Sequence, residues 1–166
     1  STSKQAEKHK RKGNSARIYT VTSGKGGVGK SNFTANLALA LQETGKRVVI
    51  FDADLGLANL DVILGVTPNY NLNHVISGKK DIQDIILQGP NNIHLIPGGS
   101  GVEELANLSN YQLNQLIDSW SKLETEYDII LIDTGAGLSK IVINFILAAD
   151  ETFVISTSEP TAITDA

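Results

Sequence analysis

The chain has 166 residues, of which 41% are hydrophobic and 19% charged, a composition typical of a globular domain large enough to bury a core. It contains no cysteine, which excludes disulfides and thiolate metal sites within these residues, and no apolar run long enough to span a membrane. The formal net charge of −4 combines +5 in residues 1–17 with −9 in the remainder, so we do not expect the acidic remainder to bind nucleic acid.

The first sixteen residues form a basic segment without hydrophobic periodicity. Such a charge run is typical of a disordered arm, and the alternative interpretation is a docking segment for an acidic partner, a lipid surface or nucleic acid. We therefore divide the chain into an arm, residues 1–16, and one domain, residues 17–166.

The first strong pattern is a glycine-rich stretch, residues 24–31, that fits the phosphate-binding motif G-x-x-x-x-G-K-[ST]. It follows an apolar run at 18–22 that predicts a buried strand. It precedes residues 32–43, in which apolar side chains such as Phe33 and Ala40 recur at helical spacing. Backbone N–H groups of such a loop and the following helix start bind phosphate oxygens. The predicted nucleotide-binding residues are Gly24, Lys25, Gly26, Gly27, Val28, Gly29, Lys30, Ser31 and Asn32.

A second buried strand is predicted at residues 48–51, and two carboxylates, Asp52 and Asp54, follow it directly. In open α/β sheets, ligands bind at the carboxyl ends of the strands. A catalytic or metal-binding role is therefore predicted for at least one of these acids, the alternative being an ordinary loop and helix cap.

The middle of the chain is predicted to contain a third strand, several short helices and one long helix. A third strand is expected at 93–96, where His94 is interpreted as a half-buried polar residue. Ser109 is expected to cap a helix that runs to about Glu126 and packs one apolar stripe, including Ile117 and Trp120, against the core. Short helices are predicted at 59–64, 72–76 and 81–87.

Residues 127–133 run without a break from apolar side chains into Asp133, which is the Walker B arrangement for placing a carboxylate near Mg²⁺. A helix at 139–149, a fifth strand at 152–156 and the start of another helix at Ser158 are expected next. Strands that alternate with helices predict an α/β fold with a doubly wound, mostly parallel sheet. Because the sequence stops early in the final helix, we expect it to be a C-terminally truncated domain.

Three motifs together resemble those of the MinD/ParA ATPases, which are P-loop proteins of the SIMIBI type. Lys25, directly after the first glycine, resembles the signature lysine of the deviant Walker A motif. Residues 51–61 resemble the switch I segment of that family, and residues 132–137 resemble switch II. Residues 133–139 and 158–166 are most similar to its flagellar branch, called FlhG, YlxH or FleN.

This resemblance implies a role for each motif residue. Lys30 would bind the β- and γ-phosphates, and Lys25 would stabilise charge on the nucleotide of a partner subunit. Asp54 would orient or deprotonate the attacking water. Ser31, Asp52 and Asp133 would hold or support Mg²⁺.

The resemblance also implies cofactors and partners: ATP or ADP with Mg²⁺, a homodimer when ATP is bound, and a cytoplasmic protein that binds the cell membrane peripherally through a C-terminal helix not found in these residues. The flagellar branch further implies an FlhF-type GTPase and flagellar switch-complex proteins as partners. Its N-terminal GTPase-activating segment is reduced here to Gln5 and Ala6 with a basic end.

Other interpretations remain open at this stage. They are a septum-positioning MinD or a ParA-type positioning ATPase, a metabolic or metallocluster enzyme on the same fold, and an ATP-binding interaction module without turnover. Because an adenine-contacting loop and the membrane helix would lie beyond Ala166, we expect these residues alone to bind nucleotide weakly and to dimerise poorly.

Overall fold

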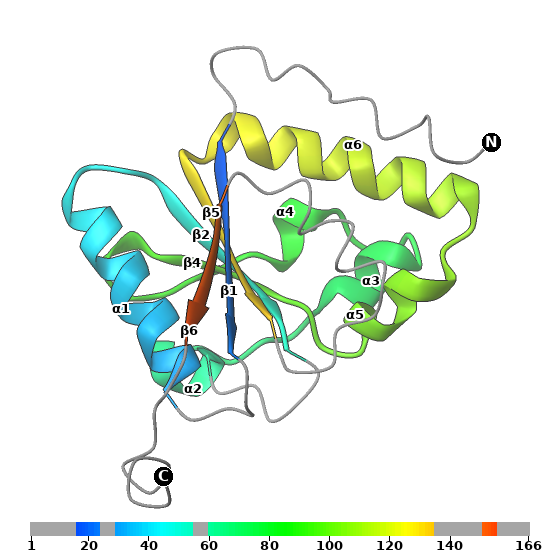
Figure 1. Cartoon of the computed structure of the whole chain (residues 1–166). Helices are drawn as coiled ribbons and strands as arrows, with labels where there is room; N and C mark the ends of the chain where they lie inside the picture. Colours follow the sequence, from blue (N-terminus) through cyan, green and yellow to red (C-terminus); the bar gives the residue numbers. More distant parts are fainter. Residues whose placement is uncertain (1–15, 24–28, 55–59, 135–150, 156–166) are drawn as a thin grey trace, which may run out of the picture.

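The computed structural model describes residues 16–23, 29–54, 60–134 and 151–155. These segments build a six-stranded sheet in the order β3-β4-β2-β5-β1-β6 (Figure 1). All neighbouring strands are parallel except β3 and β4, so the predicted mostly parallel α/β sheet is confirmed. The strands are β1 (Arg17–Ser23), β2 (Val48–Ala53), β3 (Leu87–Gln88), β4 (His94–Pro97), β5 (Ile129–Thr134) and β6 (Glu151–Ile155).

Helices cover both faces of the sheet, as a doubly wound fold requires (Figure 1). The helices α1 (Lys30–Glu43) and α2 (Leu60–Leu64) cover one face. The other face is covered by α3 (Leu72–Ile76), α4 (Ile82–Ile85), α5 (Gly101–Glu104) and α6 (Asn110–Glu126). Two separate apolar cores result, one on each side of the sheet. Among the described helices, none combines the length and the hydropathy that crossing a bilayer would demand.

The central strands β2 and β5 are buried along their whole length, which explains their unbroken apolar sequences. They pair in register, with Asp52 of β2 opposite Asp133 of β5. On its other side β5 pairs with β1, where Asp133 lies opposite Val21. Both acids therefore lie at the carboxyl edge of the sheet, and Asp133 lies beside the strand that leads into the glycine-rich loop.

The long helix α6 begins where the sequence predicts. Ser109 accepts a hydrogen bond from the N–H of Gln112 at 3.2 Å, and the Gln112 side chain accepts one from the Ser109 N–H at 3.0 Å. Trp120 packs edge-to-face on Phe51, with 5.7 Å between ring centroids, and so has the predicted packing role. The prediction for Ile117 was wrong, because its side chain is 45% exposed.

The buried face of α1 also differs from the expectation. Phe33 is 40% exposed and Ala40 is exposed, whereas Thr34, Ala35 and Ala38 are buried against the sheet. Small residues let a helix approach a sheet closely, and the Thr34 hydroxyl is satisfied by the Lys30 carbonyl oxygen at 3.0 Å. The helix starts at Lys30, two residues earlier than predicted, so Lys30 itself lies in the buried layer.

Short elements account for the remaining differences. The helix predicted at 81–87 ends at Ile85, and Leu87–Gln88 instead forms the antiparallel edge strand β3. The sequence also did not predict α5. The helices expected at 139–149 and from Ser158 lie outside the described residues.

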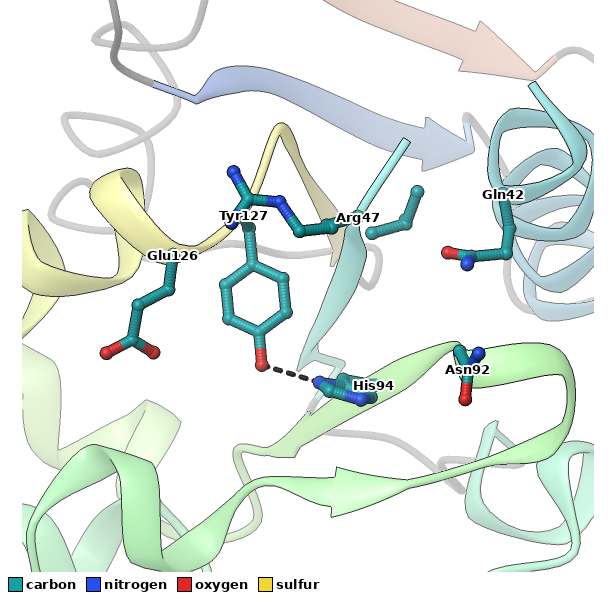
Figure 2. A pocket seen from close by; sticks show the side chains of 7 residues that line it. Gln42, Arg47, Asn92, His94, Glu126 and Tyr127 are labelled. Atoms are coloured by element: carbon teal, nitrogen blue, oxygen red, sulfur yellow. Dashed lines mark hydrogen bonds between the residues drawn. The ribbon is translucent and has the colours of Figure 1, made fainter. Parts of the chain in front are cut away.

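At the amino edge of the sheet, the half-buried His94 pairs with the buried Tyr127 (Figure 2). Their Nδ1 and hydroxyl oxygen are 2.6 Å apart, and the rings meet edge-to-face. Burial lowers the pKa of His94 and raises the pKa of Tyr127 to about 12, so both side chains are neutral near pH 7.

This pair predicts a pH dependence of stability. In the unfolded chain a histidine takes up a proton below about pH 6.5, whereas folded His94 resists protonation because its pKa is lowered. Its contribution to the free energy of unfolding is therefore present above that pH and is lost as the pH falls through the folded pKa. Urea denaturation between pH 7.5 and 5 should show this loss, and a His94→Gln variant should show less of it. If the free energy of unfolding depended on pH equally in both proteins, the lowered pKa of His94 would not be the cause of the loss.

Candidate functional site

The site lies at the carboxyl edge of the sheet, where the glycine-rich loop turns into α1. Gly29 has φ +88° and provides the N-terminal boundary of the helix, and its carbonyl accepts the N–H of Phe33 at 2.9 Å. A left-handed residue is needed at this turn, and glycine adopts it without strain. The predicted residues Gly24, Lys25, Gly26, Gly27 and Val28 lie outside the described residues.

Lys30 is the centre of the described site. Its side chain is 1% exposed, and its Nζ donates to Asp133 Oδ1. The same ammonium lies 3.5 Å from Asp54 Oδ2. A buried ammonium needs such partners, since desolvating an unpaired charge costs several kcal/mol. The structure thus brings together three residues that are far apart in the sequence.

Asp133 is fully buried at the end of β5. Burial raises the pKa of Asp133, and the hydrogen bond from Lys30 opposes that rise. Ser31, on the first turn of α1, places its hydroxyl 3.4 Å from Asp133 Oδ2. The predicted partnership of Ser31 and Asp133 is therefore geometrically possible, with the two oxygens already close.

Asp52 and Asp54 differ in their surroundings. Asp52 is buried, and this burial raises its pKa to about 7, although the backbone N–H of Asp54 donates to Asp52 Oδ1 at 3.3 Å and opposes the rise. The Asp54 side chain remains 18% exposed. Asp54 is thus the more exposed of the two acids.

These residues suit a divalent cation bound together with phosphate. Among the described residues of the site, Lys30 is the cation beside the Asp54 and Asp133 carboxylates, so a divalent cation would offset the excess of negative charge. No group of three or more His, Asp or Glu side chains in the described part of the chain is arranged to hold a metal by itself. Mg²⁺ in nucleotide sites usually takes only one or two protein ligands, with phosphate and water supplying the others. Ser31 and Asp133 could be these two protein ligands.

Two supports of the site were not predicted from the sequence. The Thr134 hydroxyl donates to the Val21 carbonyl oxygen at 3.0 Å, which ties the end of β5 to the strand before the glycine-rich loop. Gly98, after β4, lies so close to β2 that a Cβ there would overlap the carbonyl oxygen of Asp52. In the sequence, the glycine-rich residues 98–101 simply follow the strand expected at 93–96, and their spacing does not reveal which backbone they approach.

Comparison with known proteins gives one family and several relatives. A family model described as an AAA domain matches residues 16–165. The antiactivator FleN of Pseudomonas aeruginosa is 45% identical over 149 residues, which are 90% of this chain and 53% of that protein. The flagellum site-determining protein YlxH of Helicobacter pylori is 46% identical over 156 residues, or 93% of this chain and 52% of that protein.

Solved structures agree with these relatives. The MinC:MinD complex of Aquifex aeolicus matches with a TM-score of 0.69 and 32% identity, covering 91% of this chain and 60% of that one. The MinD protein of Pyrococcus horikoshii, complexed with Mg-ADP, matches with a TM-score of 0.66 and 33% identity, covering 91% of this chain and 62% of that one. The chain spans about half the length of the curated relatives it matches.

Proposed function

Because this chain belongs to the MinD/ParA family of P-loop ATPases and resembles its flagellar members, we propose that it carries the nucleotide site of an ATP-hydrolysing switch that controls the number or placement of flagella. The observation that carries this proposal is the buried contact of Lys30 with Asp133 and Asp54 at the start of α1. It puts the motif lysine, a Walker B acid and a candidate base within one small volume.

The Lys30 ammonium is surrounded by anionic acceptors, the environment that a bound phosphate would also provide. The γ- and β-phosphate oxygens of ATP are anionic hydrogen-bond acceptors, as the carboxylates of Asp133 and Asp54 are, so they can take over the ammonium when nucleotide binds. Asp133 is then released toward Ser31 and the cation that accompanies the phosphates. In this proposal Gly24 to Gly29 cradle the phosphates with Lys30, Ser31 and Asn32.

Hydrolysis then needs a water molecule in line with the γ-phosphate. Asp54 is proposed to orient or deprotonate this water, because it is the partly exposed acid beside Lys30. Ser31 and Asp133 would hold Mg²⁺, with Asp52 as their support, and the ion would supply charge neutralisation of the phosphates. Lys25 is proposed to act on the nucleotide of a second subunit, so that ATP favours a homodimer and hydrolysis separates it.

The flagellar assignment follows the two flagellar relatives, both at about 45% identity. We propose a cytoplasmic protein, peripheral to the cell membrane, with an FlhF-type GTPase and flagellar switch-complex proteins as partners. The second candidate is a septum-positioning role of the MinD type. Similarity to the MinD of Thermotoga maritima, 35% over 153 residues, favours it less. A protein that binds ATP without turnover is the third.

An Asp54→Ala variant tests the proposed chemistry. We expect it to lower the rate of ATP hydrolysis by about 100-fold, since a positioned base typically contributes 10²- to 10⁴-fold. ATP affinity should change less than threefold, because the proposed phosphate and cation ligands, Lys30, Ser31 and Asp133, are unchanged. Phosphate release and calorimetric titration with ATP and Mg²⁺ measure the two quantities, in this chain and in a version extended to the length of its relatives.

The matched control is Asp118→Ala, which removes an exposed carboxylate from α6. It should leave both hydrolysis and binding unchanged. Hydrolysis that is equally fast in the Asp54 variant would remove Asp54 as the base. A wild-type protein that binds ATP but releases no phosphate would favour the module without turnover.

A further inference from the structure

A threonine follows Asp133, the acid proposed to hold Mg²⁺, and it is buried as deeply as the acid itself. Asp133 and Thr134 are the last two residues of β5, and both are fully buried. Side chains alternate along a strand, and those of β5 pack in turn on the α1 face and the α6 face of the sheet. Asp133 lies on the α1 face with Lys30, and Thr134 belongs to the opposite face. Any influence of Thr134 on the site therefore passes through neighbouring residues.

The two neighbours of β5 end their pairing with it at different residues. On the β2 side the register continues to Thr134, which lies opposite Ala53. On the β1 side it ends one residue earlier, where Val21 lies opposite Asp133. Beyond that pair, β1 continues along β6 as far as Ser23, and the glycine-rich loop follows (Figure 1). Strand β1 thus leaves β5 just before the chain enters the phosphate-binding motif.

The Thr134 hydroxyl bridges this point of divergence. It donates to the carbonyl oxygen of Val21 at 3.0 Å, and both residues are fully buried. A buried carbonyl that loses its donor is costly, so this bond favours the native spacing of the two strand ends. At this point a side chain, rather than the backbone ladder, connects the strand that carries Asp133 to the strand that leads into the loop.

The spacing of these strand ends matters because the two halves of the site come from them. Asp133 belongs to β5, whereas Lys30 and Ser31 follow the loop after β1. The Ser31 hydroxyl lies 3.4 Å from Asp133 Oδ2, already at the long end of hydrogen-bond distances. Mg²⁺ demands near-ideal octahedral geometry with ligands at about 2.0–2.1 Å. A small displacement of either strand end would therefore impair a cation site shared by Ser31 and Asp133.

We propose that Thr134 is a positioning residue for Mg²⁺. Its hydroxyl holds the end of β5 so that the Asp133 carboxylate can share the ion with Ser31, and it thereby couples cation binding to nucleotide binding. This inference rests on the proposed ATPase function, which assigns the ion to those two residues. Thr134 itself contacts neither the ion nor the phosphates. Loss of the hydroxyl should therefore reduce the gain in ATP affinity that Mg²⁺ provides, while the contact of Lys30 with the phosphates remains.

The test compares ATP affinity with Mg²⁺ and with EDTA, by calorimetric titration of the chain extended to the length of its relatives. Thr134→Val keeps the branched shape of the side chain but cannot donate. We expect the ratio of the two dissociation constants to fall about tenfold, as is typical when a group that orients a metal ligand is lost. Affinity in EDTA should be unchanged, which a general loss of structure would not give. Thr134→Ser restores the hydroxyl and should restore the ratio.

Thr20→Val is the matched control. Thr20 is also a fully buried threonine of the sheet, but its hydroxyl oxygen has no hydrogen-bond partner among the described residues. The same exchange there should leave the ratio unchanged. An unchanged ratio in Thr134→Val would overturn the positioning role, and so would an equal fall in Thr134→Ser or in Thr20→Val. A wild-type protein that binds no ATP in either condition would overturn the proposed function itself, and the role of Thr134 with it.

Discussion

Replacing Lys30 by methionine is expected to abolish measurable ATP binding and to lower the free energy of unfolding by about 3–5 kcal/mol. The ammonium of Lys30 is the counter-charge of Asp133, which is fully buried, and it also lies 3.5 Å from Asp54. Methionine fills a similar volume but leaves Asp133 buried and unpaired. One substitution thus removes the proposed phosphate ligand and the counter-charge of the buried Asp133.

A second substitution separates these two effects. In the double variant Lys30→Met with Asp133→Asn, the buried carboxylate is replaced by a neutral amide, so most of the lost stability should return. ATP binding should stay absent, because the amide cannot replace a lysine at the phosphates. Urea denaturation measures the first quantity and calorimetric titration the second.

The control for this experiment is Lys79→Met, which removes an exposed lysine far from the site in sequence and should change neither quantity. A single Lys30 variant as stable as the wild type would mean that the ammonium does not balance the buried acids. A double variant that binds ATP normally would exclude Lys30 as the phosphate ligand.

The sequence predicted the main elements of this site because their patterns are local. The apolar run that ends in Asp133 could only be a buried strand, and the structure shows it buried throughout. The same reasoning placed the strand before Asp52. Because parallel strands share one carboxyl edge, two such predictions together bring their acids close without any knowledge of the fold's details.

What the sequence could not predict depends on the distances between elements. Besides Lys30, the buried residues of α1 are Thr34, Ala35 and Ala38, which carry a weak hydrophobic signal. The prediction instead relied on the larger apolar Phe33, which is exposed. The edge strand β3 has only two residues, too few for an alternating pattern. The contact of Thr134 with Val21 joins residues 113 positions apart, and only the register of β1 and β5 explains it.

Replacing Gly98 by alanine is expected to lower the free energy of unfolding by about 3 kcal/mol or more. The added Cβ would overlap the Asp52 carbonyl oxygen and lie 2.5 Å from Val102 Cγ2. The valine side chain can rotate, but the carbonyl belongs to β2, which is fixed between β4 and β5. The clash can therefore be relieved only by moving the loop or the strand.

The matched control is Gly45→Ala, at a position with φ +87° and no atom within 4 Å of an added Cβ. Its cost should be limited to the strain of a left-handed alanine, about 1–2 kcal/mol. Since Asp52 leads directly to Asp54, the Gly98 variant should also bind Mg-ATP more weakly than the Gly45 variant, even at a temperature where both are folded. Chemical denaturation and calorimetry measure both quantities. Equal stability and equal affinity in the two variants would mean that the close approach of Gly98 to β2 does not support the site.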